Sequence, residues 1–216
     1  LKEIYLIGIP AALESVFWQL SAMFLSKMIL RYGSNAYASY QIGLQAEAIT
    51  EMPAYGFGTA ATTLIARAIG RGDSKSKKEY FKEMIKIGLI ISSITSCLLI
   101  FFPGVFMNMM TEIEAIKPAG IMYVFIMGFV QIPQTLSRVY NGTIRAEGHK
   151  NAPMYITAIG IWGIRIPLCF LASSIFKWDL NFIWIFIALD QIVRFALSFL
   201  FHRYSGKKQL KNQQID

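Results

Sequence analysis

Apolar residues fall into six long runs that follow one another along the chain, separated by short polar connections. A helix needs about 20 mostly apolar residues to cross the hydrocarbon core of a bilayer, and the backbone groups of a segment in lipid must be hydrogen-bonded within it. The two-residue alternation of a membrane-spanning barrel is absent. The pattern predicts an all-α membrane protein, a bundle of six transmembrane helices at residues 4–30, 38–69, 85–102, 119–144, 153–176 and 182–201.

These runs occupy nearly the whole chain and leave no room for a soluble domain. We therefore expect one membrane unit over residues 1–206 and a basic polar tail over 207–216. The second helix is longer than the hydrocarbon core is thick, so we expect it to tilt, or to kink near Pro53. The chain begins at Leu1 and enters the first apolar run almost at once, so we expect a fragment or a half of a longer protein.

Composition supports the membrane assignment. Of the 216 residues, 55% are hydrophobic and only 16% are charged, whereas soluble domains carry about 25% charged residues. The net charge of +8 would suggest nucleic acid in a soluble protein. Here the basic residues lie in the connections, so membrane lipid is the expected partner and no nucleic acid is expected.

Lysine and arginine gather in alternate connections, at residues 71–82 and 145–150, and again at 203–211. Short cytoplasmic loops are enriched in these residues. We therefore expect a multi-pass protein of the plasma membrane with both ends of this segment in the cytoplasm. The stretch 71–86 is mildly amphipathic, and we expect it to form a solvated helix near the lipid headgroups.

The sequence offers little for soluble catalysis. Cys97 and Cys169 lie far apart within apolar runs, without the spacing of a disulfide or a metal site. His149 and His202 fall in a loop and in the tail, and there is no P-loop. We expect neither an enzyme nor a bound cofactor.

Ionisable residues inside a membrane span are costly and are candidates for function. Glu14 precedes the turn at Gly33 by about as many residues as Glu51 follows it, so both carboxylates are expected at similar depth on adjacent antiparallel helices. Glu47 lies one helical turn from Glu51. Neither of the first two helices carries a lysine or arginine at that depth. Close carboxylates in a low dielectric share a proton or bind a cation, so we expect these three acids to couple transport to protons or sodium. The alternatives are that the acids face water, or that each pairs with a separate cation.

The last two helices give a second match in depth. Arg165 precedes Trp178 by about as many residues as Asp190 follows it, and Arg194 lies one turn beyond Asp190. We expect a buried ion pair of Arg165 and Asp190, within reach of Arg194, with a mainly structural role.

Polar residues also concentrate in the fourth helix. They suggest a face toward a water-filled cavity, with hydrogen bonding between helices as the alternative. Candidates for substrate contact are Gln131, Gln134, Arg138 and Asn141, together with Gln41 on the second helix.

Several stretches carry a family resemblance. Residues 38–44, 52–64 and 70–73 resemble the signature of the MATE (multidrug and toxic compound extrusion) family. Residues 8–14 resemble the start of that family's seventh helix, and residues 141–145 and 162–167 resemble its tenth and eleventh helices. The resemblance implies twelve helices in two six-helix lobes, of which this chain would be the C-terminal lobe. It implies antiport of small cationic or amphipathic substrates against sodium ions or protons, and a missing N-terminal six-helix lobe, from the same gene or a homologous half, as partner.

The chain departs from the family pattern at two positions. Several members bind the cation through an acidic residue on the tenth helix, and that position is Gln134 here. Some members carry the acid of the seventh helix where this chain has Trp18, one turn beyond Glu14. The cation site is therefore expected at Glu14 with the acids of the second helix, or in the N-terminal lobe. Competing interpretations are a lipid-linked oligosaccharide flippase of the same superfamily, favoured if Arg138 and Arg165 face the cavity, and a non-transporting remnant or assembly protein.

Overall fold

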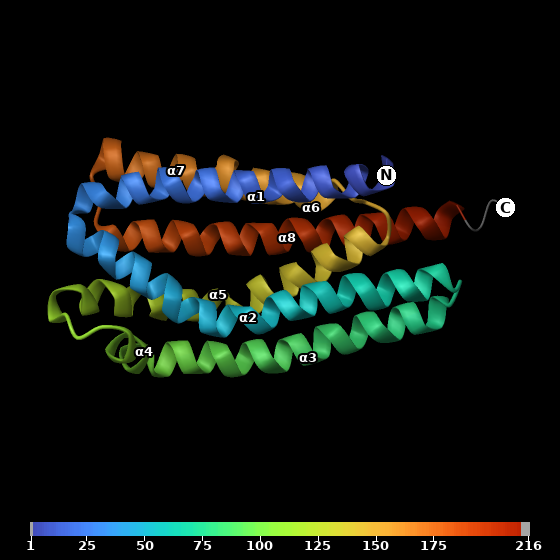
Figure 1. The fold of residues 1–216 in the computed structure, drawn as a ribbon, viewed down its shortest axis with the longest axis horizontal. Helices are drawn as coiled ribbons and strands as arrows, with labels where there is room; N and C mark the ends of the chain where they lie inside the picture. Colours follow the sequence, from blue (N-terminus) through green and yellow to red (C-terminus); the bar gives the residue numbers. More distant parts are fainter. Residues whose placement is uncertain (1, 213–216) are drawn as a thin grey trace.

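The computed structural model describes residues 2–212, which form long helices joined by short connections (Figure 1). The helices are α1 (Lys2–Ile29), α2 (Ser34–Gly70), α3 (Ser74–Phe101), α4 (Pro103–Met110), α5 (Lys117–Ala146), α6 (Ala152–Gly160), α7 (Ile166–Phe170) and α8 (Leu180–Asn212). Two π-helical segments, Ile161–Arg165 and Leu171–Phe176, join α6 and α7 into one helical rod that ends at Phe176. The all-helical prediction is confirmed.

Within the described residues, four segments are long and apolar enough to cross a membrane: Ser74–Phe101, Glu114–Ala146, Ala152–Phe176 and Leu180–Ser205. Two further helices are long enough to cross a membrane, α1 with 28 residues and α2 with 37, but they are not among these four candidate spans. The six predicted spans thus correspond to six helical rods, of which four meet the length and composition of a span.

The helix boundaries differ in places from the sequence prediction. The stretch 71–86 does not form a separate surface helix, because α3 begins at Ser74 and continues unbroken. Asp73 caps α3 by accepting hydrogen bonds from the backbone N–H groups of Lys75 (3.1 Å) and Ser76 (3.0 Å). The short helix α4 was not predicted. α8 extends beyond the predicted end of the sixth span at residue 201 and continues to Asn212, so it includes the first residues of the predicted polar tail; residues 213–216 lie outside the described part of the chain.

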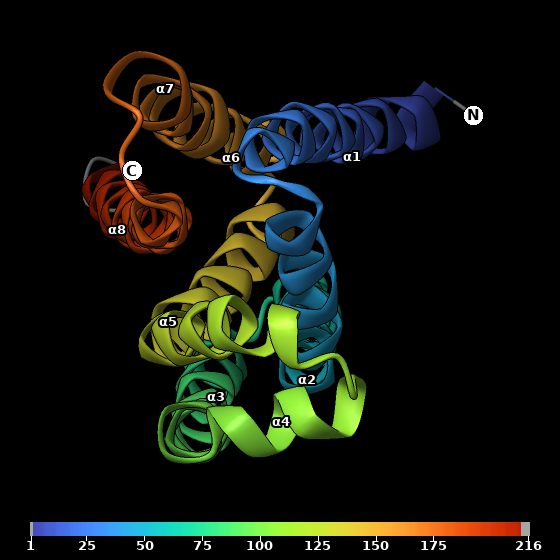
Figure 2. The same cartoon turned by 90° about the vertical axis from the view of Figure 1, so that its left-hand side faces the viewer.

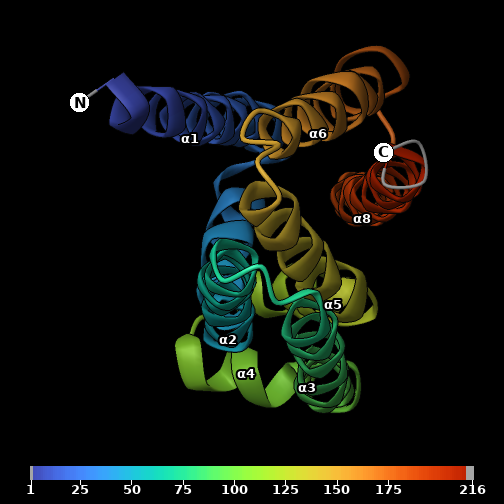
Figure 3. The same cartoon turned by 90° about the vertical axis from the view of Figure 1, so that its right-hand side faces the viewer.

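The helices form two groups. Figures 2 and 3 show α2, α3, α4 and α5 together on one side, with α1, the rod of α6 and α7, and α8 on the other. The beginning of α1 and the end of α8 lie at the same end of the molecule as the connection between α2 and α3, and the turn between α1 and α2 lies at the opposite end (Figure 1). This arrangement agrees with the alternation of basic and less basic connections along the sequence.

Glycines let α2 and α5 cross at close range. A Cβ atom on Gly142 would lie 2.4 Å from the carbonyl oxygen of Gly58, and a Cβ on Gly58 would lie 3.2 Å from the carbonyl oxygen of Arg138. Small residues of this kind let helices in a membrane approach closely. α2 stays helical through Pro53, and Figure 1 shows it changing direction partway along its length.

An aromatic cluster joins the two groups of helices. Tyr40 of α2 stacks on Trp184 of α8 with ring centroids 5.6 Å apart, and Tyr123 of α5 meets Trp184 edge to face at 5.1 Å. All three rings are buried. Tyr40 and Tyr123 also line the cavity described next, so the cluster forms part of its wall.

Candidate functional site

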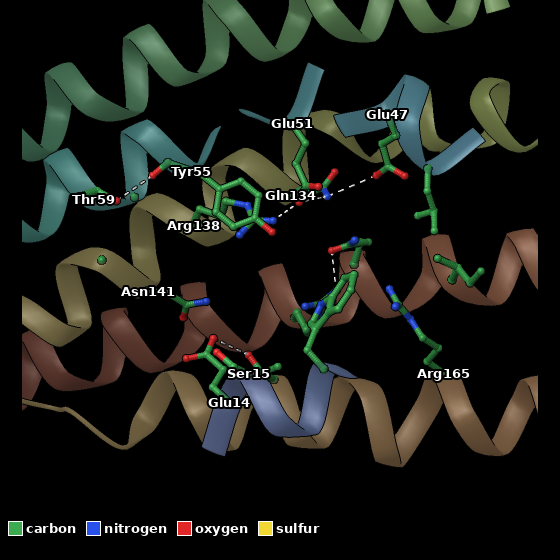
Figure 4. Close-up of a pocket in the computed structure, with 18 of the residues that line it drawn as sticks. Glu14, Ser15, Glu47, Glu51, Tyr55, Thr59, Gln134, Arg138, Asn141 and Arg165 are labelled. Carbon is green, nitrogen blue, oxygen red and sulfur yellow. Dashed lines mark hydrogen bonds and ion pairs between the residues drawn. The ribbon is translucent and has the colours of Figure 1, made fainter. Parts of the chain in front are cut away.

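A cavity of about 640 Å³ lies between the two groups of helices and is lined by residues of α1, α2, α5, α6 and α8 and of the π-helical segment before α7 (Figure 4). Most of the residues singled out from the sequence line it: Glu14, Glu47, Glu51, Gln134, Arg138, Asn141, Arg165 and Arg194. The polar face expected of the fourth predicted helix, which is α5, is therefore turned to a cavity.

Two facing helices supply most of the charged wall. On α2, Glu47 and Glu51 lie one turn apart, and Tyr55 lies one turn further on. On α5, polar residues recur at positions 134, 138, 141 and 145. Residues three or four apart share one face of a helix, so each helix presents a continuous polar stripe to the cavity.

Glu51 is held by α5. Its carboxylate forms an ion pair with Arg138 and accepts a hydrogen bond from Gln134 Nε2 at 2.8 Å. The guanidinium of Arg138 lies over the ring of Tyr55, 3.4 Å from the centroid, which is cation–π geometry. Glu51 therefore has a counter-ion, supplied by a helix that the depth count from Gly33 did not consider.

Glu47 has a different environment. Its carboxylate accepts a hydrogen bond from Tyr123 OH at 2.5 Å and a longer one from Gln134 Nε2 at 3.4 Å. The residue is only 5% exposed. In the described part of the chain no lysine or arginine lies within ion-pair distance of it. Gln134 thus bridges the two acids, and Glu47 is the member of the pair that keeps an unbalanced carboxylate.

Glu14 does not share a site with Glu51 in the way the depth count suggested. It forms an ion pair with Arg145, in the last turn of α5, and accepts a hydrogen bond from Thr157 of α6 at 3.2 Å. Glu14 and Glu51 each pair with their own arginine on α5, which is the alternative in which each acid has a separate cation. The physical reason is the turn at Gly33 (φ 107°), after which α2 diverges from α1 (Figure 2).

The ion pair expected in the last two helices is present. Arg165 Nη2 lies 2.8 Å from Asp190 Oδ2, and Arg194 Nη2 lies 3.0 Å from the same oxygen. Asp190 is fully buried and is not among the residues that line the cavity. Arg165 ends the π-helical segment Ile161–Arg165, two residues before Pro167, which has no N–H to donate.

Two predicted substrate-contact residues do not line the cavity. Gln131 is buried at 1% exposure, and its Nε2 has no hydrogen-bond partner in the described structure. Gln41 donates a hydrogen bond to Tyr37 OH at 2.7 Å. Asn141 does line the cavity, and its Oδ1 accepts a hydrogen bond from Ser198 of α8 at 3.0 Å.

Sequence reasoning did not single out several residues of the site, among them Arg145, Tyr123, Tyr55 and Thr157. Arg145 was assigned to a cytoplasmic connection, although its spacing from Arg138 and Asn141 places it on the polar stripe of α5. Tyr55, one turn after Glu51, could have been found by the same rule. Tyr123 and Thr157 had no such signal, because they reach the acids from other helices.

A second charged cluster lies at the basic end of the bundle. Glu147, just after α5, contacts Lys77 of α3 (Nζ to Oε1, 2.7 Å) and His202 of α8 (Nδ1 to Oε2, 3.6 Å). Burial alone raises the pKa of Glu147, but the proximity of His202 and Lys77 outweighs it, so the pKa lies below its ordinary value. The hydrogen bonds from Ser76 likewise hold the pKa of Asp73 below its usual range. The described residues contain no group of three His, Cys, Asp or Glu side chains able to hold a metal ion.

Helices long enough to cross a membrane surround a cavity lined with charged residues. This arrangement identifies the molecule as a multi-pass helical membrane protein. The comparisons with known proteins name the family. Residues 10–171 match the family described as MatE, and the chain belongs to that family. The family resemblance seen in the sequence is thus confirmed, and its members are named as transporters, not enzymes.

Relatives and solved structures agree with this assignment. The chain is 33% identical over 210 residues to a probable multidrug resistance protein NorM of Thermotoga maritima, covering 95% of this chain and 44% of that protein. It is 24% identical to a probable multidrug resistance protein YoeA of Bacillus subtilis, covering 94% of this chain and 44% of that protein. A structure described as the outward-facing conformation of a multidrug resistance MATE family transporter matches with a TM-score of 0.88 at 18% identity, covering 97% of this chain and 47% of that one. The chain therefore spans less than half the length of these relatives.

Proposed function

We propose that the chain is the C-terminal lobe of a secondary active multidrug efflux transporter. It would export organic cations or other amphipathic compounds by antiport against sodium ions or protons, together with an N-terminal six-helix lobe. The observation that carries this proposal is the carboxylate of Glu47, which lies in the wall of a large cavity without a lysine or arginine partner among the described residues.

The arrangement of the acids supports a coupling role. Glu14, Glu47 and Glu51 all line the cavity, but two of them are neutralised by arginines. Binding of a proton or sodium ion at Glu47 would neutralise the negative charge of this carboxylate. Release of that ion would restore a negative site that attracts a cationic substrate. Gln134 would transmit the change, since it donates hydrogen bonds to both Glu47 and Glu51. In this proposal Glu47 is the coupling residue, with Glu14 and Glu51 as supporting members.

The proposed orientation places both ends of this segment in the cytoplasm. A cysteine introduced at Asp73 or His149 is then expected to be protected from impermeant thiol reagents added outside intact cells. A cysteine at Ser34 or Glu114 is expected to be labelled. The reverse pattern would overturn the orientation.

Efflux of a fluorescent cation tests the function. Cells lacking their own drug pumps would express the transporter that contains this chain, be loaded with ethidium, and be placed under a proton gradient or a sodium gradient separately. We expect faster efflux under one of the two gradients than in cells with an empty vector. Membrane-inserted protein that exports no cationic dye under either gradient would contradict the proposal.

One observation favours a second candidate, a lipid-linked oligosaccharide flippase of the same superfamily. Arg138 and Arg165 both line the cavity, and cationic side chains suit a pyrophosphate group. Arg138 is already paired with Glu51, however, and Arg165 with Asp190. Transfer of a short-chain polyprenyl-pyrophosphate oligosaccharide across proteoliposomes, without dye efflux, would support this candidate over the first.

A further inference from the structure

A second cavity lies between α6 and α8, and we call it the outer groove. Its volume is about 830 Å³, and it is lined by residues 148–151, by the start of α6 and by the later part of α8. Figure 1 shows these segments toward the end of the molecule where α2 connects to α3, which is the end rich in lysine and arginine. The efflux mechanism proposed above makes no use of this groove.

The outer groove is separate from the central cavity. On α6, Thr157 lines the central cavity, whereas Tyr155 and Ile159 line the outer groove. Residues two positions apart in an α-helix point in roughly opposite directions, because each residue turns the helix by about 100°. α6 therefore turns one face to the central cavity and the other to the surroundings of the bundle.

The walls of the outer groove are mostly apolar. Both helices contribute branched or aromatic side chains, which are Ile156 and Ile159 of α6 and Leu197, Leu200 and Phe201 of α8. The residues of α8 follow one another at helical spacing, so they share one face. The lining stretch from Leu197 to Tyr204 runs about 10 Å along the helix axis. A groove of this length and chemistry fits part of an acyl chain.

Polar groups gather at one end of the outer groove, where the connection between α5 and α6 runs. They include His149, Lys150 and Asn151, and the lining residues include no aspartate or glutamate. Among the described residues, no acid lies within ion-pair distance of Lys150. Tyrosines, here Tyr155 and Tyr204, are enriched where a membrane protein meets the lipid headgroups. The groove thus combines an apolar channel with a positively charged end.

The charged end is held in place by the packing of the connection. Gly148 adopts a left-handed conformation (φ 92°), and the N–H of His149 donates to the carbonyl oxygen of Ile144 at 3.1 Å. His149 Nε2 lies 2.8 Å from Ser205 Oγ of α8, and its ring meets Phe201 edge to face at 5.4 Å. A site that is ordered before its ligand arrives loses little conformational freedom on binding.

Basic pockets between membrane helices bind the headgroups of anionic lipids. We propose that the outer groove binds one anionic phospholipid from the leaflet at the basic end of the bundle, with its phosphate at Lys150 and an acyl chain between α6 and α8. A zwitterionic phospholipid offers the same chain without a net negative charge, so it binds more weakly. The inference goes beyond the proposed function and does not depend on it, because binding of this lipid requires no transport.

Photo-crosslinking tests the site without any variant. The purified transporter that contains this chain is placed in phosphatidylcholine nanodiscs with a trace of a phospholipid that carries a diazirine on one acyl chain. The probe has either a phosphatidylglycerol or a phosphatidylcholine headgroup. We expect the phosphatidylglycerol probe to label peptides covering residues 148–160 and 197–204 about fivefold more than the phosphatidylcholine probe. Equal labelling of these peptides by the two probes would overturn the proposal.

The variant Lys150→Gln tests the contact with the phosphate. Because Lys150 has no acidic partner among the described residues, folding is expected to survive. We expect labelling by the phosphatidylglycerol probe to fall about fivefold, to the level of the phosphatidylcholine probe, and Lys150→Arg is expected to retain most of it. Lys78→Gln is the matched control, an exposed lysine of α3 at the same end that does not line the groove. Equal losses in Lys150→Gln and Lys78→Gln would show a diffuse attraction and contradict a defined site.

The variant Ile159→Trp tests the position of the acyl chain. Ile159 is 54% exposed, so a larger side chain can fill the groove without disturbing the buried packing. Labelling of the groove peptides by both probes is expected to fall. Unchanged labelling would place the chain elsewhere, and a change in oligomeric state with unchanged labelling would assign the groove to a second protein chain; either result overturns the proposal. Loss of dye efflux from a preparation that keeps its lipid labelling would count against the efflux function alone.

Discussion

The carboxylate of Glu14 in α1 forms an ion pair with Arg145 in the last turn of α5. The two residues lie more than a hundred positions apart in the sequence. Both side chains line the cavity and both are partly exposed to it. The pair connects the two groups of helices across the cavity. A change at Glu14 is therefore expected to affect how the groups move, more than how the substrate binds.

The variant Glu14→Gln tests this connection. We expect gradient-driven dye efflux to fall about tenfold, with dye affinity changed less than about twofold, because the lost contact is an ion pair and not a substrate contact. Efflux and equilibrium dye binding would be measured on the same preparation. The double variant Glu14→Gln/Arg145→Gln serves as the control and is expected to recover part of the rate. Normal efflux by Glu14→Gln at every pH and sodium concentration would remove Glu14 from the mechanism.

Asp190 is expected to be the least replaceable acid of the chain. Asp190→Asn would leave the buried guanidiniums of Arg165 and Arg194 without a carboxylate, and breaking a buried pair in this way costs about 3–5 kcal/mol. We expect a large loss of folded protein, measured by thermal unfolding in detergent. Exchanging the residues, Arg165→Asp with Asp190→Arg, should restore part of the yield. Normal folding of Asp190→Asn without transport would instead assign the residue to the mechanism.

The crossing of α2 and α5 gives a prediction with a control in the same chain. In Gly142→Ala the new methyl group would lie 2.4 Å from the carbonyl oxygen of Gly58, and backbone cannot move aside cheaply. We expect a loss of about 1–3 kcal/mol in stability, as for other overpacked cores. Gly56→Ala meets nothing within 4 Å and is expected to be neutral or slightly stabilising. Equal behaviour of the two variants would contradict the close crossing.

Glu147 predicts a pH-dependent contribution to stability at the basic end. Because its pKa is lowered in the folded protein, the contacts with Lys77 and His202 stabilise the fold above the ordinary glutamate value of about 4.3 and are lost as the pH falls through the lower folded-state value. We expect Glu147→Gln to be less stable by roughly 1–2 kcal/mol at neutral pH, because the acid is nearly buried but Lys77 is partly exposed. The difference should vanish in strong acid, as measured by unfolding midpoints across pH. A constant difference at all pH values would show that the charge is not responsible.

The helices and most cavity residues could be predicted from the sequence because both leave a periodic signal along the chain. Apolar runs mark the helices, and the spacing of Gln134, Arg138 and Asn141 marks the polar face of α5. Counting from the turn at Trp178 also placed Arg165 beside Asp190, since the two helices there do run side by side. The same count failed for Glu14 and Glu51 because α1 and α2 diverge after Gly33.

Contacts between distant helices leave no such signal. The arginines that neutralise Glu14 and Glu51 both come from α5, and the partner of Glu47 is a tyrosine in an apolar stretch of that helix. The packing of the helices on α5 shows which acid has no cationic partner among the residues that the structure describes. The sequence could identify three candidate acids, but it could not rank them.

The structure ranks Glu47 first, and this gives the most direct test of coupling. Glu47 is buried, it accepts a hydrogen bond from Tyr123, and it shares Gln134 with Glu51. Among the described residues, Glu47 is the one carboxylate lining the cavity that has no arginine partner. Glu47→Gln should therefore abolish the response of efflux to the driving gradient, with a rate at least about tenfold below wild type. Glu51→Gln is the matched control one turn away on the same face, and it is expected to shift the pH or sodium dependence while efflux continues.

Tyr123→Phe adds a second, milder change at the same carboxylate. It keeps the ring that packs on Trp184 but removes the hydroxyl that donates to Glu47, so we expect folding to be retained and the pH or sodium dependence of efflux to shift. Dye efflux from proteoliposomes with imposed proton or sodium gradients measures all three variants under identical conditions. Gradient-driven efflux that persists at the wild-type rate in Glu47→Gln would place the coupling site outside this lobe.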